Sequence, residues 1–198
     1  TIISGYTATA FLKDQIARGE IAPADLIQLT QAATRFGIGS LGFSALMAVH
    51  AQYLAGRSEA DYIANSERLF RRAIAKLIYP EARQLIEAHR AAGHSIAIIS
   101  SATPYQVLPA AKDLGIEDIY ASDLEVVDGQ FTGGVVTPTC FGQGKVDAAE
   151  RCTEKQSSDL GRCFFYSDST DDIELLEVAG RPVVLNGSRE LKTIARES

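Results

Sequence analysis

Three polar stretches in the second half of the chain have residue types suited to phosphate and a divalent cation. The last of them, Ser167–Asp172, holds the carboxylates of Asp168, Asp171 and Asp172 within five residues. Hard cations such as Mg²⁺ select carboxylate oxygens and water. The helix dipole also favours acidic residues at a helix N-terminus, which accounts for one or two carboxylates more readily than for three. The cluster therefore predicts a magnesium site.

The first polar stretch follows the apolar run Ile96–Ile99. Ser101 and Ala102 lie between this run and Pro104, where a helix is predicted to begin. A hydroxyl group beside the unpaired N–H groups of a helix N-terminus is suited to bind phosphate. The alternative is that Ser101 or Thr103 only caps the helix. We expect Ser101 and Ala102 to bind substrate.

Lys145 provides the third candidate group. It begins a predicted helix directly after Gly142 and Gly144. A lysine at a helix start is unfavourable for the helix dipole, but it is well placed as a point charge against phosphate or against clustered carboxylates. The alternative is an ordinary surface lysine.

The pattern after Pro80 predicts the elements that position these groups. Short β-branched apolar runs alternate with helix-like segments that end at glycine, which is typical of βαβ units with a parallel sheet. Asp128-Gly129 between apolar runs indicates a hairpin. Strands are predicted at 95–100, 119–121, 163–166 and 183–185, a hairpin at 124–136, and helices at 81–92, 104–114, 145–155 and 171–178. Since ligands bind at the carboxyl ends of parallel strands, all three polar stretches are expected at one edge.

The first 80 residues predict helices without intervening strands. Pro23 and Gly37 bracket one helix, residues 41–54 form a second, and Ser58 with Asp61 resembles a capping box that opens a third, running to Leu77. The fold class predicted is α/β: a Rossmann-like parallel sheet that follows a small helical bundle.

Composition limits the possible partners. The chain has 198 residues, 46% of them hydrophobic, and a net charge of −6, so a basic surface for nucleic acid is not expected. The basic residues Arg68, Arg71, Arg72 and Lys76 have helical spacing and are interpreted as a solvated helix face. No apolar run is long enough to span a bilayer, and three cysteines without metal-ligand spacing favour a reducing compartment. A cytoplasmic location is expected.

Together the motifs resemble the haloacid dehalogenase superfamily, and within it the phosphoserine-phosphatase-like subgroup. Ser101 matches the second family motif, Lys145 the third, and Asp168 with Asp172 the fourth. The resemblance implies an α/β core of residues 1–4 and 79–198 and a helical cap of residues 5–78.

The same resemblance implies a Mg²⁺-dependent phosphomonoesterase that forms an aspartyl-phosphate. Lys145 and Ser101 would contact the phosphoryl group, Asp168 would bind Mg²⁺, and Asp172 would hold a metal-bound water or orient Lys145. The family's nucleophilic and acid–base aspartates would lie upstream of Thr1, at the end of a strand in the middle of the sheet. Without that strand two sheet edges would be exposed.

The substrate expected is a small phosphorylated molecule, phosphoserine-like or lipid-linked. The text from Ile78 to Ile116 also resembles a phosphatase-like segment fused to lysophospholipid acyltransferases. Alternatives are an inactive binding domain, or Thr1 as an N-terminal nucleophile. Polar cap residues that could face the site are Tyr6, Thr7, Arg35, His50 and Arg72.

Overall fold

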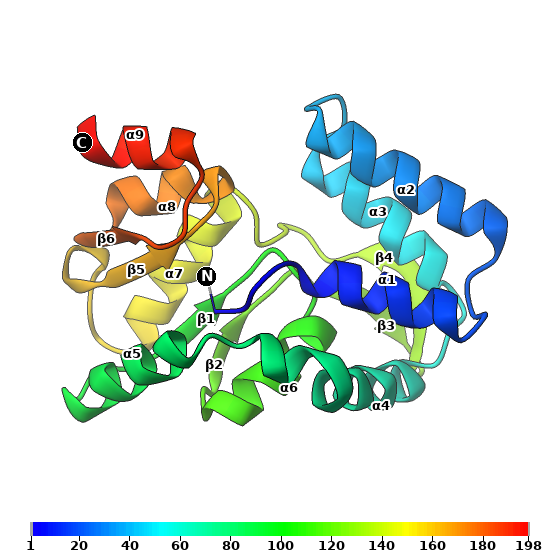
Figure 1. Ribbon diagram of the computed structural model, residues 1–198, viewed down its shortest axis with the longest axis horizontal. Helices are drawn as coiled ribbons and strands as arrows, with labels where there is room; N and C mark the ends of the chain where they lie inside the picture. The colour runs from blue at the N-terminus through cyan, green and yellow to red at the C-terminus, as the bar shows by residue number, and fades with distance from the viewer. Residues whose placement is uncertain (1, 198) are drawn as a thin grey trace.

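Helices form the first part of the chain, as predicted. The computed structural model describes residues 2–197, with side chains to residue 194, so the prediction for Thr1 lies outside the described residues. The helices of this part, at the right of Figure 1, are α1 (Thr7–Ala17), α2 (Pro23–Gly37), α3 (Phe43–Leu54) and α4 (Glu59–Leu69). The sequence pattern had not delimited α1.

The third predicted helix differs from the expectation in its geometry. Ser58 caps it as predicted, since its hydroxyl accepts a hydrogen bond of 3.2 Å from the Asp61 N–H. After α4 the helix continues to Leu77, but through a π-helical turn at Phe70–Ile74 and a 3₁₀ turn at Ala75–Leu77. Such changes in helix type depend on how the last turns pack, which the apolar spacing alone does not encode.

Strands and helices alternate in the second part, which confirms the α/β fold class. The elements are α5 (Pro80–Ala91), β1 (Ala97–Ile99), α6 (Pro104–Leu114), β2 (Asp118–Tyr120), β3 (Leu124–Val127), β4 (Gln130–Val135), α7 (Gln143–Lys155), β5 (Phe164–Ser167), α8 (Ile173–Val178), β6 (Arg181–Val184) and α9 (Arg189–Glu197). Asp128 and Gly129 both have positive φ, as the predicted hairpin turn requires. The helix α9 was not predicted.

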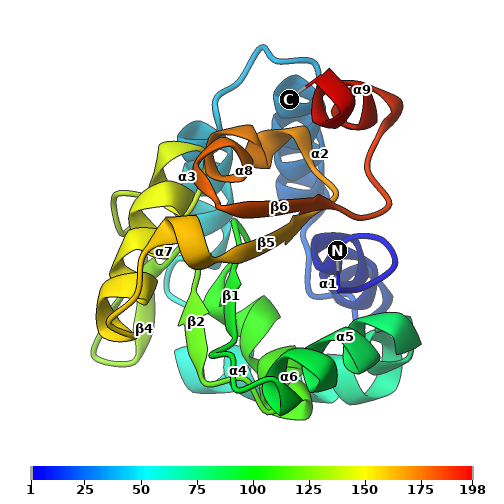
Figure 2. The same ribbon diagram turned by 90° about the vertical axis from the view of Figure 1, so that its left-hand side faces the viewer.

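The parallel strands form two separate pairs. β1 pairs with β2, with Ile98 opposite Ile119, and β5 pairs with β6, with Tyr166 opposite Val183. Within residues 2–197 no hydrogen-bonded ladder joins β1 to β5, and the two pairs are distinct in Figure 2. Each of these strands is thus paired along one edge among the described residues.

One small apolar cluster nevertheless connects the two pairs. Val146 and Ala149 of α7 pack with Leu175 of α8, and both Ile99 of β1 and Phe165 of β5 pack against them. The same helical layer therefore covers both pairs, which places the ends of β1 and β5 near the start of α7.

The helical part contacts the rest of the chain at several places. Residues 2–4 and 77–79 run side by side, because Ser4 N–H donates to the Leu77 carbonyl over 2.9 Å and Tyr79 N–H donates to that of Ile2 over 3.0 Å. The hairpin β3–β4 also packs on the helical part, where Phe131 contacts Tyr62 edge-on.

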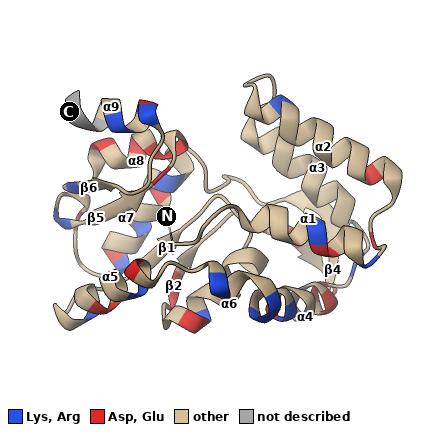
Figure 3. Cartoon of the chain, in the orientation of Figure 1, with Lys and Arg blue, Asp and Glu red and all other residues tan. Residues whose placement is uncertain are grey.

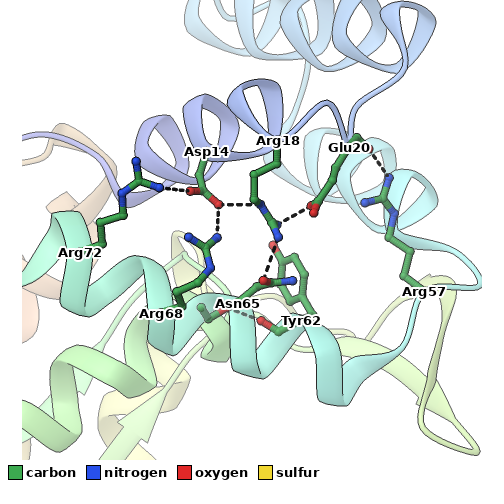
Figure 4. A network of polar contacts seen from close by, with 9 residues as sticks. Asp14, Arg18, Glu20, Arg57, Tyr62, Asn65, Arg68 and Arg72 are labelled. Carbon is green, nitrogen blue, oxygen red and sulfur yellow. Dashed lines mark hydrogen bonds and ion pairs between the residues drawn. The ribbon is translucent and has the colours of Figure 1, made fainter.

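A polar network fixes α1 against α4 and the turn that follows it (Figure 4). Asp14 is 9% exposed and accepts a hydrogen bond of 2.5 Å from Arg68, while Arg18 lies 3.1 Å and Arg72 3.9 Å from its carboxylate. Burial raises the pKa of Asp14, but the hydrogen bond and charge of Arg68 and the charges of Arg18 and Arg72 outweigh it, so the net pKa lies below its ordinary value. Arg68 and Arg72 therefore form ion pairs with Asp14 inside the helical part.

We predict that Asp14→Asn lowers the free energy of unfolding by about 1.5–3 kcal/mol at pH 7, because charge-assisted hydrogen bonds are lost. The pKa of Asp14 is lower in the folded state than in the unfolded state, where it is about 3.9. Its charged carboxyl therefore stabilises the folded protein above about pH 3.9, and this stabilisation is lost as the pH falls through the folded pKa. The gap between wild type and variant, measured by urea unfolding, should therefore close below about pH 4. Glu87→Gln, in the exposed Glu87–Arg90 pair, serves as control. An equal gap at pH 3 and pH 7 would contradict the assignment.

Candidate functional site

A buried ion pair forms the centre of the candidate site. Lys145 is 6% exposed and Asp172 is 8% exposed, and the Lys145 ammonium donates to Oδ1 of Asp172. The other carboxylate oxygen, Oδ2, accepts a hydrogen bond of 2.5 Å from the Ser167 hydroxyl. Both oxygens of Asp172 are thus engaged, one by α7 and one by the last residue of β5. Two of the predicted site residues are in direct contact.

The glycines before Lys145 explain how the chain reaches this position. Gly142, which precedes α7, has a φ of +52°, a conformation that L-residues rarely adopt. A Cβ at Gly144 would overlap the backbone carbonyl oxygen of Thr139. The sharp turn into α7 therefore requires glycine at both positions, and Lys145 is buried in the first turn of the helix.

Ser101 and Ala102 lie in the predicted loop between β1 and α6. The Ala102 N–H donates to Oγ of Ser100 over 3.2 Å, and Thr103, not Ser101, precedes the helix and bonds through its N–H to the Gln106 side chain over 3.1 Å. Among the described residues the Ser101 hydroxyl has no hydrogen-bond partner. It is half-buried, so it remains available to a ligand.

Cys140 connects this loop to the ion pair, and the sequence pattern gave no signal for it. It is 4% exposed, and its N–H donates to Oγ of Ser122 over 3.0 Å. Burial raises the pKa of the Cys140 thiol, while the positive charge of Lys145 and a backbone hydrogen bond from Ser100 oppose this rise. Ser100 after β1 and Lys145 at the start of α7 therefore both lie near Cys140.

The other two aspartates of the predicted cluster are exposed. Asp168 follows β5 directly, and Asp171 donates its N–H to Oγ of Ser169 over 3.1 Å. Within the described part of the chain, no three His, Cys, Asp or Glu side chains converge as a metal cage would need. Mg²⁺ is commonly held by one or two carboxylates, with waters and substrate phosphate completing its shell. An exposed carboxylate at a strand end, as in Asp168, fits that requirement. The two oxygens of Asp172 accept hydrogen bonds from Lys145 and Ser167.

The predicted cap residues have different environments. Tyr6 is 83% exposed, Arg35 lies exposed in the last turn of α2, and Arg72 faces Asp14. His50 on α3 is half-buried, and burial lowers its pKa to about 4, so its imidazole is neutral at pH 7.

None of the helices in the described residues has the length and apolar character needed to cross a bilayer.

A comparison with protein families assigns the chain to a family. A family model described as haloacid dehalogenase-like hydrolase matches residues 1–177. The chain belongs to this family. The resemblance inferred from Ser101, Lys145, Asp168 and Asp172 is therefore confirmed at the level of the family, and the roles of these residues stay predictions.

Similar proteins include several named phosphatases. A phosphoserine phosphatase, SerB1, of Mycobacterium tuberculosis is 31% identical over 202 residues, which cover 100% of this chain and 65% of that protein. A histidinol-phosphatase of Neisseria meningitidis is 29% identical, with 80% of this chain and 73% of that protein covered. A solved structure of a protein of unknown function from Bordetella pertussis has a TM-score of 0.90 at 26% identity, covering 100% of this chain and 91% of that one. The chain thus spans about two thirds of the length of the mycobacterial relative.

We predict that Lys145→Met lowers the free energy of unfolding by about 3–5 kcal/mol, because the Asp172 charge is left buried without a cation. The double variant Lys145→Met/Asp172→Leu should recover most of this loss, since an apolar pair carries no uncompensated charge. Urea unfolding measures both.

Lys155→Met on the same helix is the matched control. Its ammonium pairs with Asp118 but is 63% exposed, so we expect a far smaller loss of stability than in Lys145→Met. Wild-type stability in Lys145→Met, or a double variant weaker than the single one, would show that the pair is not the buried centre of the site.

Proposed function

We propose that this haloacid dehalogenase-like hydrolase is a Mg²⁺-dependent phosphomonoesterase that acts on a small phosphorylated molecule through an aspartyl-phosphate. The observation that carries the proposal is the Lys145–Asp172–Ser167 arrangement. An ammonium has three N–H donors. Asp172 accepts from one of them, so two remain for phosphoryl oxygens while the lysine stays fixed in position.

We further propose that a fifth parallel strand lies between β1 and β5 and carries the nucleophile. The unjoined edges of the two pairs and the apolar cluster that both contact support this arrangement. A strand there would end at the same edge as Ile99 and Ser167, beside Lys145. The family resemblance implies an Asp-x-Asp-Gly sequence at its end.

In the proposed reaction the first aspartate attacks phosphorus, and the bond to the leaving alcohol oxygen breaks as the second aspartate gives that oxygen a proton. Water then attacks the aspartyl-phosphate, the second aspartate takes a proton back, and inorganic phosphate leaves. Lys145 and the Ser101 hydroxyl stabilise the phosphoryl oxygens, and the Ala102 N–H joins them on release from Ser100. Mg²⁺, with Asp168 as its protein ligand on this chain, would neutralise phosphate charge.

Residues 5–78 are proposed to act as a cap over a core of residues 1–4 and 79–198. The two chain crossings at 2–4 and 77–79 lie side by side, as an inserted unit requires. The cap would then set the substrate, which we place among small phosphate monoesters such as those of the relatives named phosphatases.

The direct test uses the chain extended by the residues encoded immediately before Thr1. We predict that it hydrolyses p-nitrophenyl phosphate with Mg²⁺, that EDTA abolishes the activity, and that Asp168→Asn lowers kcat at least 100-fold. Asp171→Asn, an exposed carboxylate of the same turn, should stay within twofold of wild type. Phosphate release measures all variants.

Two outcomes would overturn the proposal. If the upstream sequence lacks Asp-x-Asp-Gly, the proposed nucleophile is absent. If a folded extended chain releases no phosphate from a broad panel of monoesters, the proposed activity is absent. The second outcome, with inorganic phosphate still bound, would favour the inactive binding domain instead.

A further inference from the structure

Three phenylalanines from distant parts of the sequence meet where the helical part contacts the loop before α7. Phe36 lies at the end of α2, Phe43 begins α3, and Phe141 precedes α7. The Phe43 and Phe141 rings stack with centroids 4.3 Å apart and an interplanar angle of 6°. Phe36 meets both rings edge-on, each at 6.0 Å. All three are half-buried, so each ring keeps some exposed surface.

One tight turn of the chain links the aromatic cluster to the ion pair. Phe141 is four residues before Lys145, and its carbonyl accepts the Gly144 N–H over 2.9 Å, so it belongs to the turn that opens α7. One helical turn advances only about 5.4 Å. A phosphate held by Lys145 would therefore have its ester group close to these rings.

The helical segment that supplies Phe36 and Phe43 carries little charge, whereas the Glu174 carboxylate lies near Gly142, the residue after Phe141. Between residues 26 and 56 Arg35 is the only Asp, Glu, Lys or Arg, although 22% of the whole chain is charged. Figure 3 shows α2 and α3 almost without coloured segments. Ile27 of α2 and Ile38, just after α2, are 56% and 73% exposed. We call α2, α3 and the loop between them the α2–α3 hairpin. An ammonium and a carboxylate on the same leaving group would each need a charged or polar partner here, because desolvating an unpaired charge is costly.

We propose that Phe36, Phe43 and Phe141 form the apolar wall that receives the leaving group, and that the preferred substrates are phosphomonoesters of uncharged, apolar alcohols. The inference rests on the proposed function and narrows its substrate class. The bonds broken and formed are those given above; the wall contributes only contact with the alcohol part. Its partly exposed ring faces and edges suit alkyl or aryl groups.

The experiment measures kcat/KM of the extended chain for butyl, hexyl and octyl phosphate, below their micellar concentrations, and for O-phosphoserine. Burying a methylene is worth about fourfold, so kcat/KM should rise by about that factor for each methylene the wall covers. Hexyl phosphate should exceed O-phosphoserine at least tenfold. The slope against chain length is read separately from the overall rate, which a structural defect alone would lower uniformly.

Phe43→Ala and Phe141→Ala should flatten the slope to less than twofold per methylene, and Phe43→Leu should keep it, because an apolar side chain remains. If Phe43→Ala does not fold, Phe141→Ala and Phe43→Leu still allow the comparison. Ile38→Ala, an exposed apolar residue of the same hairpin, is the matched control and should leave the series unchanged.

The outcomes separate the two proposals. If O-phosphoserine is the best substrate and Arg35→Ala abolishes that preference, the leaving group is charged and the apolar wall is wrong, while the phosphomonoesterase stands. A slope unaffected by Phe43→Ala and Phe141→Ala also overturns the wall. If the folded extended chain hydrolyses none of the four esters or any other monoester, both proposals fall.

Discussion

The buried contact between Lys145 and Asp172 is the interaction on which the site depends. Removing two charges from water is costly unless each has a close partner and the remaining polar atoms are satisfied. Here Ser167 meets the second carboxylate oxygen, so the arrangement links the start of α7 to the end of β5. The glycines at 142 and 144 let the chain turn tightly enough to bury the lysine. A flexible surface lysine would bind phosphate without a defined position.

A second constraint comes from the separation of the strand pairs. β1 and β5 contact one apolar cluster below α7, yet among the described residues they share no ladder. Unpaired edges inside an α/β core are unfavourable because backbone groups lose their partners. A strand between them would satisfy both edges and would bring its own C-terminal residues next to Lys145 and Asp168. The proposed strand would therefore serve both the fold and the proposed chemistry.

Local patterns account for much of what the sequence could predict. The helix α6 begins and ends at the predicted residues, and the Asp128-Gly129 turn forms where it was expected. The contact of Lys145 with Asp172 followed from both lying at the same edge of a parallel sheet. The roles of Ser101, Ala102 and Asp168 are still predictions that rest on their position.

Other features could not be predicted, because they join residues that no local pattern connects. Asp14 meets Arg68 across 54 positions, and the spacing of Arg68 and Arg72 indicated only an exposed helix face. Phe36, Phe43 and Phe141 each read as ordinary apolar residues until tertiary packing brought them together. The π-helical turn at Phe70–Ile74 likewise reflects packing and not residue type.

In the proposed function, phosphate binds between the β1–α6 loop and the start of α7. Titration of ¹⁵N-labelled protein with inorganic phosphate and Mg²⁺, followed by NMR, tests it most directly. We expect saturable shifts of the Ser101 and Ala102 amides and of the Lys145 ammonium, with the Asp14 network unaffected. Shifts concentrated around Arg18 and Arg68, with none at Lys145, would contradict it.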